Sequence, residues 1–448
     1  MKKSAKFMLL LVAFSLASCG KSHSQPRATT SAITNSDTVQ TASNEVQPNE
    51  QAAPVLRNTI QLNLEKLATD NLSFKRYALG KALPDGLPTV LAIKNGKLFY
   101  MCKKVPDNMS QAEINSLLRN SQWGAKKYYF GTYDLATKTK QEIKLDDWYL
   151  GNENYAYCVL DDNHMLVVYN STEKSPKFKD VHSKIALLDF SQQSTSLLAE
   201  YTSFDFDGIS PIRQLAKDKL VFVLDTTTNF ASREIQQIVL CYDIKATMLS
   251  ELMRAKPISA SEKEVYGLDC QDGNVKLLVK SYGKYFLRTL NPEGNQIDEL
   301  ELTDLNELKA AKNYACDFMV DGNFLFVNFE DRNNKIGNLT AVILRKIGPY
   351  YHVQNTEGLH LQSVPTAHRK KPSDPFSMAK SKLNETETYQ YYAYYPDENV
   401  FDLLDTGLTA KNNQLYTLID SDKPKLFVAA SSPNDGVAYY LSNWPKTD

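Results

Sequence analysis

Short apolar runs separated by polar turns fill the chain from Leu56 onward. In six places a run, a tight turn and a second run follow one another directly, which is the pattern of a β-hairpin. Asn95-Gly96 is a clear example, because these residue types adopt the positive φ angles that a tight hairpin turn requires. The pattern predicts six hairpins, which turn at 95–96, 161–164, 217–218, 272–274, 321–323 and 412–413.

A second series of hairpins is interleaved with the first, at intervals of roughly 50 residues. Its seven turns are expected at 135–138, 191–195, 244–248, 291–295, near Gly348, at 396–397 and at 433–436. Two hairpins per repeat make a four-stranded antiparallel sheet. A repeat of this length without a regular helix between the sheets favours a β-propeller.

We therefore predict an all-β fold in which residues 56–448 form a single β-propeller of four-stranded antiparallel blades. Seven blades are expected, six or eight are the alternatives, and two β-sandwich domains are the structural alternative. The first hairpin of one blade is hard to find between positions 359 and 383. The alternating segment 59–64 is a candidate to complete the last blade and so close the ring between the chain ends. A short helical piece is predicted from Asp304.

The first 18 residues have the organisation of a bacterial export signal. Lysines at positions 2, 3 and 6 precede an apolar run over 7–16, about half the roughly 20 residues needed to span a membrane. The run ends in Leu16-Ala17-Ser18-Cys19, which resembles the bacterial lipobox, where cleavage exposes a cysteine that carries the lipid. The resemblance implies a signal peptide over 1–18 and fatty acids such as palmitate on Cys19. A plain secretory signal is the alternative.

The residues after the signal bear on location and partners. Gly20 follows Cys19 with no acidic residue beside it. In this respect the sequence resembles lipoproteins that are sent to an outer membrane. Residues 19–55 are predicted to be the lipidated cysteine and a disordered tether, because they are polar and contain few aliphatic side chains. Removal of 1–18 takes away three lysines and leaves 48 basic and 52 acidic residues, a net charge of −4. We therefore expect no nucleic acid as a partner.

The sequence contains no compact catalytic or metal-binding motif. Gly-x-Ser-x-Gly, His-Glu-x-x-His and Cys-x-x-Cys are all absent. We predict no catalytic residue, metal site or cofactor, and Cys19 is the one functional residue assigned. The remaining cysteines are expected to be small buried residues in strands rather than a disulfide framework; they are Cys102, Cys158, Cys241, Cys270 and Cys316. The histidines do not have metal-ligand spacing; they are His23, His164, His182, His352, His360 and His368.

Some polar segments have more than one interpretation. Asp205 and Asp207 lie on one face of an extended segment and could contribute to a calcium site, but a solvated loop is favoured. The Asp-rich segments 161–163 and 321–323 are interpreted as turns. Residues 365–382 form a basic loop beside the tyrosines of 389–395. The loop could contact an acidic partner, a glycan or an anionic headgroup, but an exposed insertion is favoured.

These features predict a membrane-anchored exported lipoprotein that acts as a protein-binding or scaffolding module in the bacterial cell envelope. Its expected partners are the membrane, through the N-terminal lipid, and another envelope protein, with a glycan as a further candidate. A hydrolase or lyase acting on an exported polymer is the alternative, and binding is favoured over catalysis. An enzyme should gather acids and histidines in the central channel, whereas a scaffold should expose an apolar patch.

Overall fold

The structure is a computed structural model, and the part that it describes lies within one compact unit, Glu50–Asp448. The described residues are 53–69, 89–104, 110, 112, 127–145, 155–172, 181–203, 209–229, 234–255, 258–259, 264–312, 314–331, 338–356, 361, 365, 368–369, 374–382, 389–408, 412–419, 424–432 and 436–443. Among these residues no helix has the length and apolar character needed to cross a membrane.

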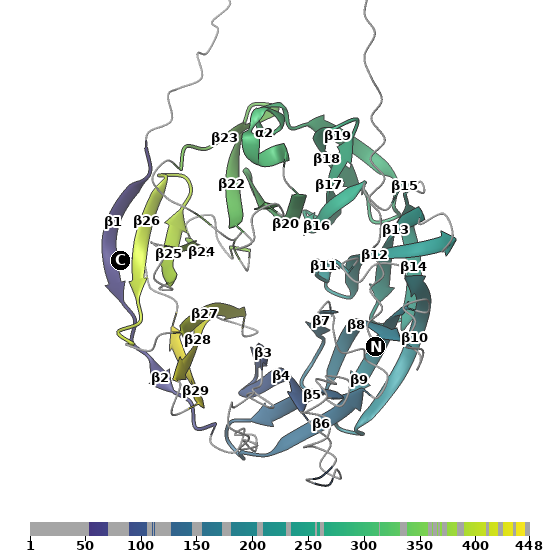
Figure 1. Cartoon of the computed structure of the whole chain (residues 1–448), viewed down its shortest axis with the longest axis vertical. Coiled ribbons are helices and arrows are strands. Elements are labelled where there is room, and N and C mark those ends of the chain that lie inside the picture. Colours follow the sequence, from purple (N-terminus) through teal and green to yellow (C-terminus); the bar gives the residue numbers. More distant parts are fainter. Residues whose placement is uncertain are drawn as a thin grey trace, which may run out of the picture. The chain divides into compact units, whose positions relative to one another are not determined.

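Seven sheets are arranged around a central axis, so the predicted β-propeller is confirmed (Figure 1). Blade 1 contains β3 (Thr89–Lys94), β4 (Lys97–Lys104), β5 (Lys127–Asp134) and β6 (Lys140–Leu145). Blade 2 contains β7 (Tyr155–Val159), β8 (His164–Thr172), β9 (Val181–Asp189) and β10 (Ser194–Ser203). Blade 3 contains β11 (Arg213–Ala216), β12 (Lys219–Asn229), β13 (Glu234–Asp243) and β14 (Met248–Arg254), with β15 (Ile258–Ser259) paired to β13.

The other four blades complete the ring. Blade 4 contains β16 (Val265–Gln271), β17 (Asn274–Ser281), β18 (Lys284–Leu290) and β19 (Gln296–Glu301). The short helices α2 (Thr303–Glu307) and η3 (Lys309–Lys312) lead to blade 5, which contains β20 (Tyr314–Asp321), β21 (Phe324–Asp331), β22 (Asn338–Ile347) and β23 (Tyr350–Val353). Blade 6 contains β24 (Phe376–Lys382), β25 (Tyr389–Tyr395), β26 (Val400–Asp405) and β1 (Val55–Gln61). Blade 7 contains β27 (Asn412–Ile419), β28 (Pro424–Ser432), β29 (Gly436–Asn443) and β2 (Glu65–Lys66).

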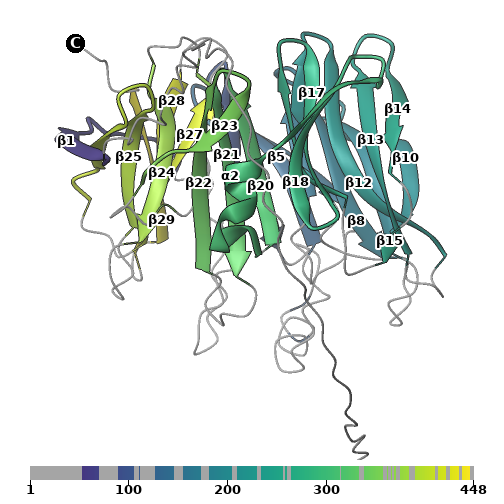
Figure 2. The ribbon, with the colours of Figure 1, turned by 90° about the horizontal axis from the view of Figure 1, so that it is seen from above.

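Within a blade the strands follow chain order from the central axis outward, except that the N-terminal strands β1 and β2 are outermost in blades 6 and 7. The innermost strands are β3, β7, β11, β16, β20, β24 and β27 (Figure 1). Seen at right angles to this view, the strands run between the two faces of the ring (Figure 2). The innermost strands therefore carry the side chains that can reach the central axis.

Tight turns form where the sequence predicts them. Asn95 and Gly96 have φ angles of 49° and 75°, and Asp272 and Gly273 have φ angles of 52° and 71°. These left-handed angles explain why Asn, Asp and Gly occupy the hairpin ends between an innermost strand and its neighbour. The short helix predicted from Asp304 also forms, as α2.

The ring is closed by the N-terminal strands, but not in the way that the sequence suggests. β2 completes blade 7 in antiparallel pairing with β29, whereas β1 completes blade 6 in parallel pairing with β26. Arg57 holds this register, because its Nε and Nη2 atoms donate to the two carboxylate oxygens of Asp402 at 3.1 and 2.6 Å. Asp402 is only 1% exposed. Blade 6 is therefore not antiparallel throughout.

Each blade packs on the blade before it and the blade after it through a buried apolar cluster. Between blades 4 and 5, Phe318 of β20 lies directly against Gly267 of β16. A methyl group at Gly267 would overlap with the Phe318 side chain. Glycine is therefore required at this position for the two innermost strands to approach each other.

Replacement of Gly267 by Ala should lower the free energy of unfolding by about 1–3 kcal/mol, because the added methyl group forces the two blades apart. Urea denaturation followed by circular dichroism measures this change. Gly283→Asn is the control, since Gly283 has open space and a positive φ that Asn tolerates. Equal stability of Gly267→Ala and the wild type would contradict the close approach.

Candidate functional site

Six charged residues from four consecutive blades converge at the innermost strands. We call them the inner-strand cluster; they are Arg213, Asp269, Asp317, Asp321, His368 and Arg369. Arg213 begins β11, Asp269 lies in β16, and the other two aspartates lie in β20. His368 and Arg369 belong to the connection that precedes β24. The cluster therefore joins blades 3, 4, 5 and 6.

Asp269 is the centre of the cluster. Its side chain is 0% exposed, and its carboxylate is satisfied by groups from three segments. Oδ2 accepts a hydrogen bond from the Val320 backbone N–H at 2.7 Å, and Oδ1 accepts one from the Cys270 backbone N–H at 2.9 Å. His368 Nε2 lies 3.0 Å from Oδ1. A buried charge is tolerated only when it is paired and hydrogen-bonded in this way.

His368 lies between two carboxylates. Its Nε2 contacts Asp269, and its Nδ1 lies 3.7 Å from Oδ2 of Asp321. Burial alone would lower the pKa of His368, but the interactions with Asp269 and Asp321 outweigh it and raise the pKa to about 9. The imidazole is therefore a cation at neutral pH, and its side chain remains 42% exposed.

Arg369 holds the other side of Asp321. Its backbone N–H donates to Oδ2 of Asp321 at 2.7 Å, and its Nε donates to Oδ1 at 3.3 Å. The guanidinium lies over the rings of Phe376 and Phe324, at 4.4 and 5.5 Å from their centroids. Burial would raise the pKa of Asp321, but the interaction with His368 and the hydrogen bond from the Arg369 backbone N–H lower it. Asp321 therefore remains ionised.

Arg213 and Asp317 are less fully paired. Arg213 Nε lies 3.6 Å from Oδ1 of Asp269, which is too long for a hydrogen bond. The Asp317 carboxylate accepts a hydrogen bond from the Phe318 backbone N–H at 2.8 Å. Burial raises the pKa of Asp317, and the nearby Arg213 offsets only part of this effect. Asp317 is thus more easily protonated than Asp321, although both lie on β20.

This arrangement is better suited to binding than to proton abstraction. A general base should have a pKa near the working pH, whereas the pKa of His368 is about 9 and both ring nitrogens face carboxylates. The exposed edge of the imidazolium can instead contact a polar or anionic group. In the described part of the chain, no group of three or more His, Cys, Asp or Glu residues could hold a metal ion.

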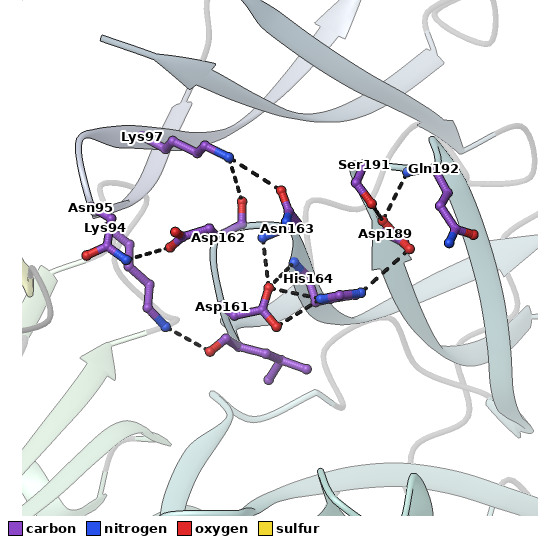
Figure 3. A network of polar contacts seen from close by, with 11 residues as sticks. Lys94, Asn95, Lys97, Asp161, Asp162, Asn163, His164, Asp189, Ser191 and Gln192 are labelled. Atoms are coloured by element: carbon purple, nitrogen blue, oxygen red, sulfur yellow. Dashed lines mark hydrogen bonds and ion pairs between the residues drawn. The ribbon is translucent and has the colours of Figure 1, made fainter. Parts of the chain in front are cut away.

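A second polar network joins the hairpin ends of blades 1 and 2 (Figure 3). Lys94 Nζ donates to the Leu160 carbonyl at 2.8 Å, and Asn95 donates to the Asp162 carboxylate at 2.6 Å. His164 Nδ1 lies 2.9 Å from the Asp161 carboxylate. Burial opposes ionisation of Asp161, but hydrogen bonds from Asn163 and His164 lower its pKa. The predicted turn role of 161–163 is confirmed, because these residues connect β7 to β8 and the Asp161 carboxylate accepts hydrogen bonds from the backbone N–H groups of Asn163 and His164. The contacts to Lys94 and Asn95 also fix the two hairpins to each other.

The other sequence candidates occupy structural positions or lie outside the described residues. Cys102, Cys158, Cys241 and Cys270 are in strands, as predicted; Cys102 and Cys241 are buried, whereas Cys158 and Cys270 are partly exposed. Burial raises the pKa of Cys158 to about 11, so this thiol is not reactive at neutral pH. The candidates that cannot be placed are Cys19, His23, His360, the Cys316 side chain and segment 205–208.

The predicted basic loop 365–382 is not one loop. Its last seven residues form β24, which pairs with the tyrosine-rich strand β25. The Arg369 side chain is only 5% exposed, because it is covered by two aromatic rings and paired with Asp321. Arg369 is therefore part of the packed ring, and the expectation of an exposed insertion is wrong for this residue.

The sequence did not identify the inner-strand cluster. Asp321 was recognised only as a turn residue, and no local motif marks Arg213, Asp269 or Asp317. His368 is 99 positions away from Asp269 along the chain. The available signal was Asp269 in β16 and Asp317 and Asp321 in β20, which are acidic residues within largely apolar innermost strands. This signal becomes meaningful only when those strands are placed side by side.

The chain matches no protein-family model and no protein of curated function. Among solved structures it is similar to the polysaccharide lyase Uly1, with 9% identity and a TM-score of 0.50 over 86% of this chain and 97% of that one. It also matches the β-propeller domain of the Trilobed protease from Pyrococcus furiosus, with 9% identity and a TM-score of 0.46 over 81% and 95% of the two chains. A GH93 α-L-arabinofuranosidase of Fusarium graminearum matches with 9% identity and a TM-score of 0.39 over 66% and 96%. At such identities the likeness shows the fold alone: the chain is a β-propeller protein.

The protonated form of His368 should stabilise the fold. Its folded-state pKa of about 9 exceeds the roughly 6.5 of an unfolded chain, so this contribution is complete below about pH 6.5 and is lost as the pH rises through about 9. We expect the difference in unfolding free energy between wild type and His368→Gln to be large near pH 6 and to shrink above about pH 9. Urea denaturation across this pH range measures it, and a difference independent of pH would contradict the ion pairing.

Proposed function

We propose that the protein is an exported lipoprotein, lipidated at Cys19, that acts as a binding module for another protein of the bacterial cell envelope. The lipobox-like Leu16-Ala17-Ser18-Cys19 supports the anchor and the location, with an outer membrane as the expected site in a bacterium that has two. The observation that carries the binding role is the inner-strand cluster. It presents the fixed cation of His368, 42% exposed, on a ring of packed blades.

The apolar patch expected of a scaffold is not what the described residues offer, so the proposed site of contact is this cluster. Large apolar side chains that are exposed in the described part are spread over blades 2 to 6; they are Leu197, Met248, Tyr282, Ile297, Ile347, Tyr350, Val55 and Leu56. The cluster, by contrast, gathers its groups in one place and holds them with buried partners. A preformed site of this kind loses little conformational freedom when a partner binds.

Cys19→Ser should release the protein from the membrane fraction, because the sulfur that would carry the lipid is lost. Fractionation of cells followed by immunoblotting measures the distribution. Cys158→Ser is the matched control and should stay with the membranes, since that thiol is in β7. If Cys19→Ser still sediments with membranes after a salt wash, the folded body itself holds a membrane partner and the lipid is not the anchor.

Cross-linking in intact envelopes and affinity purification test the binding role. The full-length protein should capture an envelope protein, and His368→Gln should capture much less of it, because the exposed cation is lost. His164→Gln is the matched control, since His164 belongs to the hairpin-end network and should leave capture unchanged. Equal capture by His368→Gln and the wild type would contradict a binding site at the cluster.

A hydrolase or lyase acting on an exported polymer is a second candidate, which the gathering of one histidine and three aspartates favours. Purified protein incubated with exported polysaccharides would then generate new reducing or unsaturated chain ends. His368→Gln should abolish this activity, while His164→Gln should retain it. Chain cleavage that persists in His368→Gln would place catalysis elsewhere.

A further inference from the structure

Arg213 has hydrogen-bond donors that the described protein does not use. A guanidinium carries five N–H donors in a fixed fork. Its Nε atom is buried without a hydrogen-bond acceptor, and the side chain as a whole is 24% exposed. Its one ion-pair contact in the described part is with Asp269, at 3.6 Å. An unsatisfied buried donor is costly, so such a group in a native fold requires an explanation.

The neighbouring carboxylates do not supply the missing acceptor. Asp269 already accepts from the backbone N–H groups of Val320 and Cys270 and contacts His368. Asp317 interacts with Arg213 through charge, and its hydrogen bond comes from Phe318. The guanidinium is thus held in place by surrounding charge. Because Nε itself is buried, a ligand from outside would meet the exposed part of the side chain, which is 24% of its surface.

We propose that Arg213 binds a carboxylate of an acidic segment of the partner protein, beside the imidazolium of His368. This inference rests on the binding function proposed above and adds the chemistry of the ligand. A carboxylate matches the planar fork of a guanidinium and can accept two of its hydrogen bonds. The cluster contains three cations and three aspartates. Asp269 and Asp321 are in contact with His368 and Arg369, so Arg213 is the cation whose charge is least directly paired, with Asp269 at 3.6 Å and Asp317 nearby.

The surroundings favour an acidic peptide over an acidic glycan. The aromatic rings close to the cluster are Phe318, Phe324 and Phe376, and each is at most 2% exposed. The described part of the site therefore offers a charge-pairing group without an exposed ring face on which a sugar could stack. The whole chain has a net charge of −1, so its overall charge does not attract an acidic segment. Recognition of such a segment must depend on the local guanidinium of Arg213.

Binding of a fluorescent hexaglutamate peptide to the full-length protein in detergent tests the proposal. Arg213→Gln should weaken binding at least about tenfold, because a charge-assisted pair is lost. Arg213→Lys should lie between this variant and the wild type, since the ammonium retains the charge without the fork. Arg254→Gln is the matched control on the outer strand β14, where Arg254 pairs with Glu251 and Gln236, and it should bind like the wild type.

A fourth variant has the opposite expected sign. Asp317→Asn removes a carboxylate next to the fork and should strengthen hexaglutamate binding severalfold, whereas a purely structural disturbance of the cluster would weaken it. Equal binding by Arg213→Gln and Arg254→Gln would overturn the proposal. Binding of polygalacturonate but not of hexaglutamate would also overturn it.

Envelope pull-downs separate the two levels of inference. If Arg213→Gln captures the same partner as the wild type to the same extent, the binding function stands and the acidic-segment proposal fails. If the wild-type protein captures no partner, the proposed function itself fails. Loss of the partner in Arg213→Gln together with weaker hexaglutamate binding supports both.

Discussion

Both faces of each sheet are apolar, and this constraint determines the architecture. In β17, Val275, Leu277 and Val279 pack toward blade 3, while the intervening Leu278 packs toward blade 5. A sheet with two apolar faces must be covered on both sides, and a row of such sheets leaves one face exposed at each end. Closing the row into a ring covers every face. The chain ends therefore have to meet, which explains why the N-terminal strands complete blades 6 and 7.

The sequence predicted the features of this fold that depend on neighbouring residues. Asn95-Gly96 and Asp272-Gly273 encode their turns locally, through positive φ angles that few other residues accept. The position of β1 depends instead on Arg57 and Asp402, which are 345 residues apart. The cluster was missed for the same reason: Asp269 and His368 acquire a role only when four blades bring their segments together.

The inner-strand cluster and the hairpin-end network use the same kinds of interaction with different results. Around His164 the donors and acceptors of two hairpins are matched to each other, and the contacts fix blade 1 to blade 2. Around Asp269, contacts with the Val320 N–H and with His368 also join neighbouring blades, but the Arg213 Nε–H has no hydrogen-bond acceptor in the described part. A site can thus be recognised by what its structural contacts leave unsatisfied, rather than by the number of charges that it gathers.

The parallel pairing of β1 with β26 has a mechanical consequence. Any pull on the chain segment before Pro54 enters the ring at the first residue of β1, where the Val55 backbone N–H donates to the Asn399 carbonyl at 3.1 Å. A few residues further on, the bidentate pair of Arg57 with the buried Asp402 resists sliding of β1 along β26. Tension from the N-terminal side is therefore carried first by the strand that closes the ring, and failure at this point would open blade 6 before it disturbed the cluster residues of blades 3 to 5.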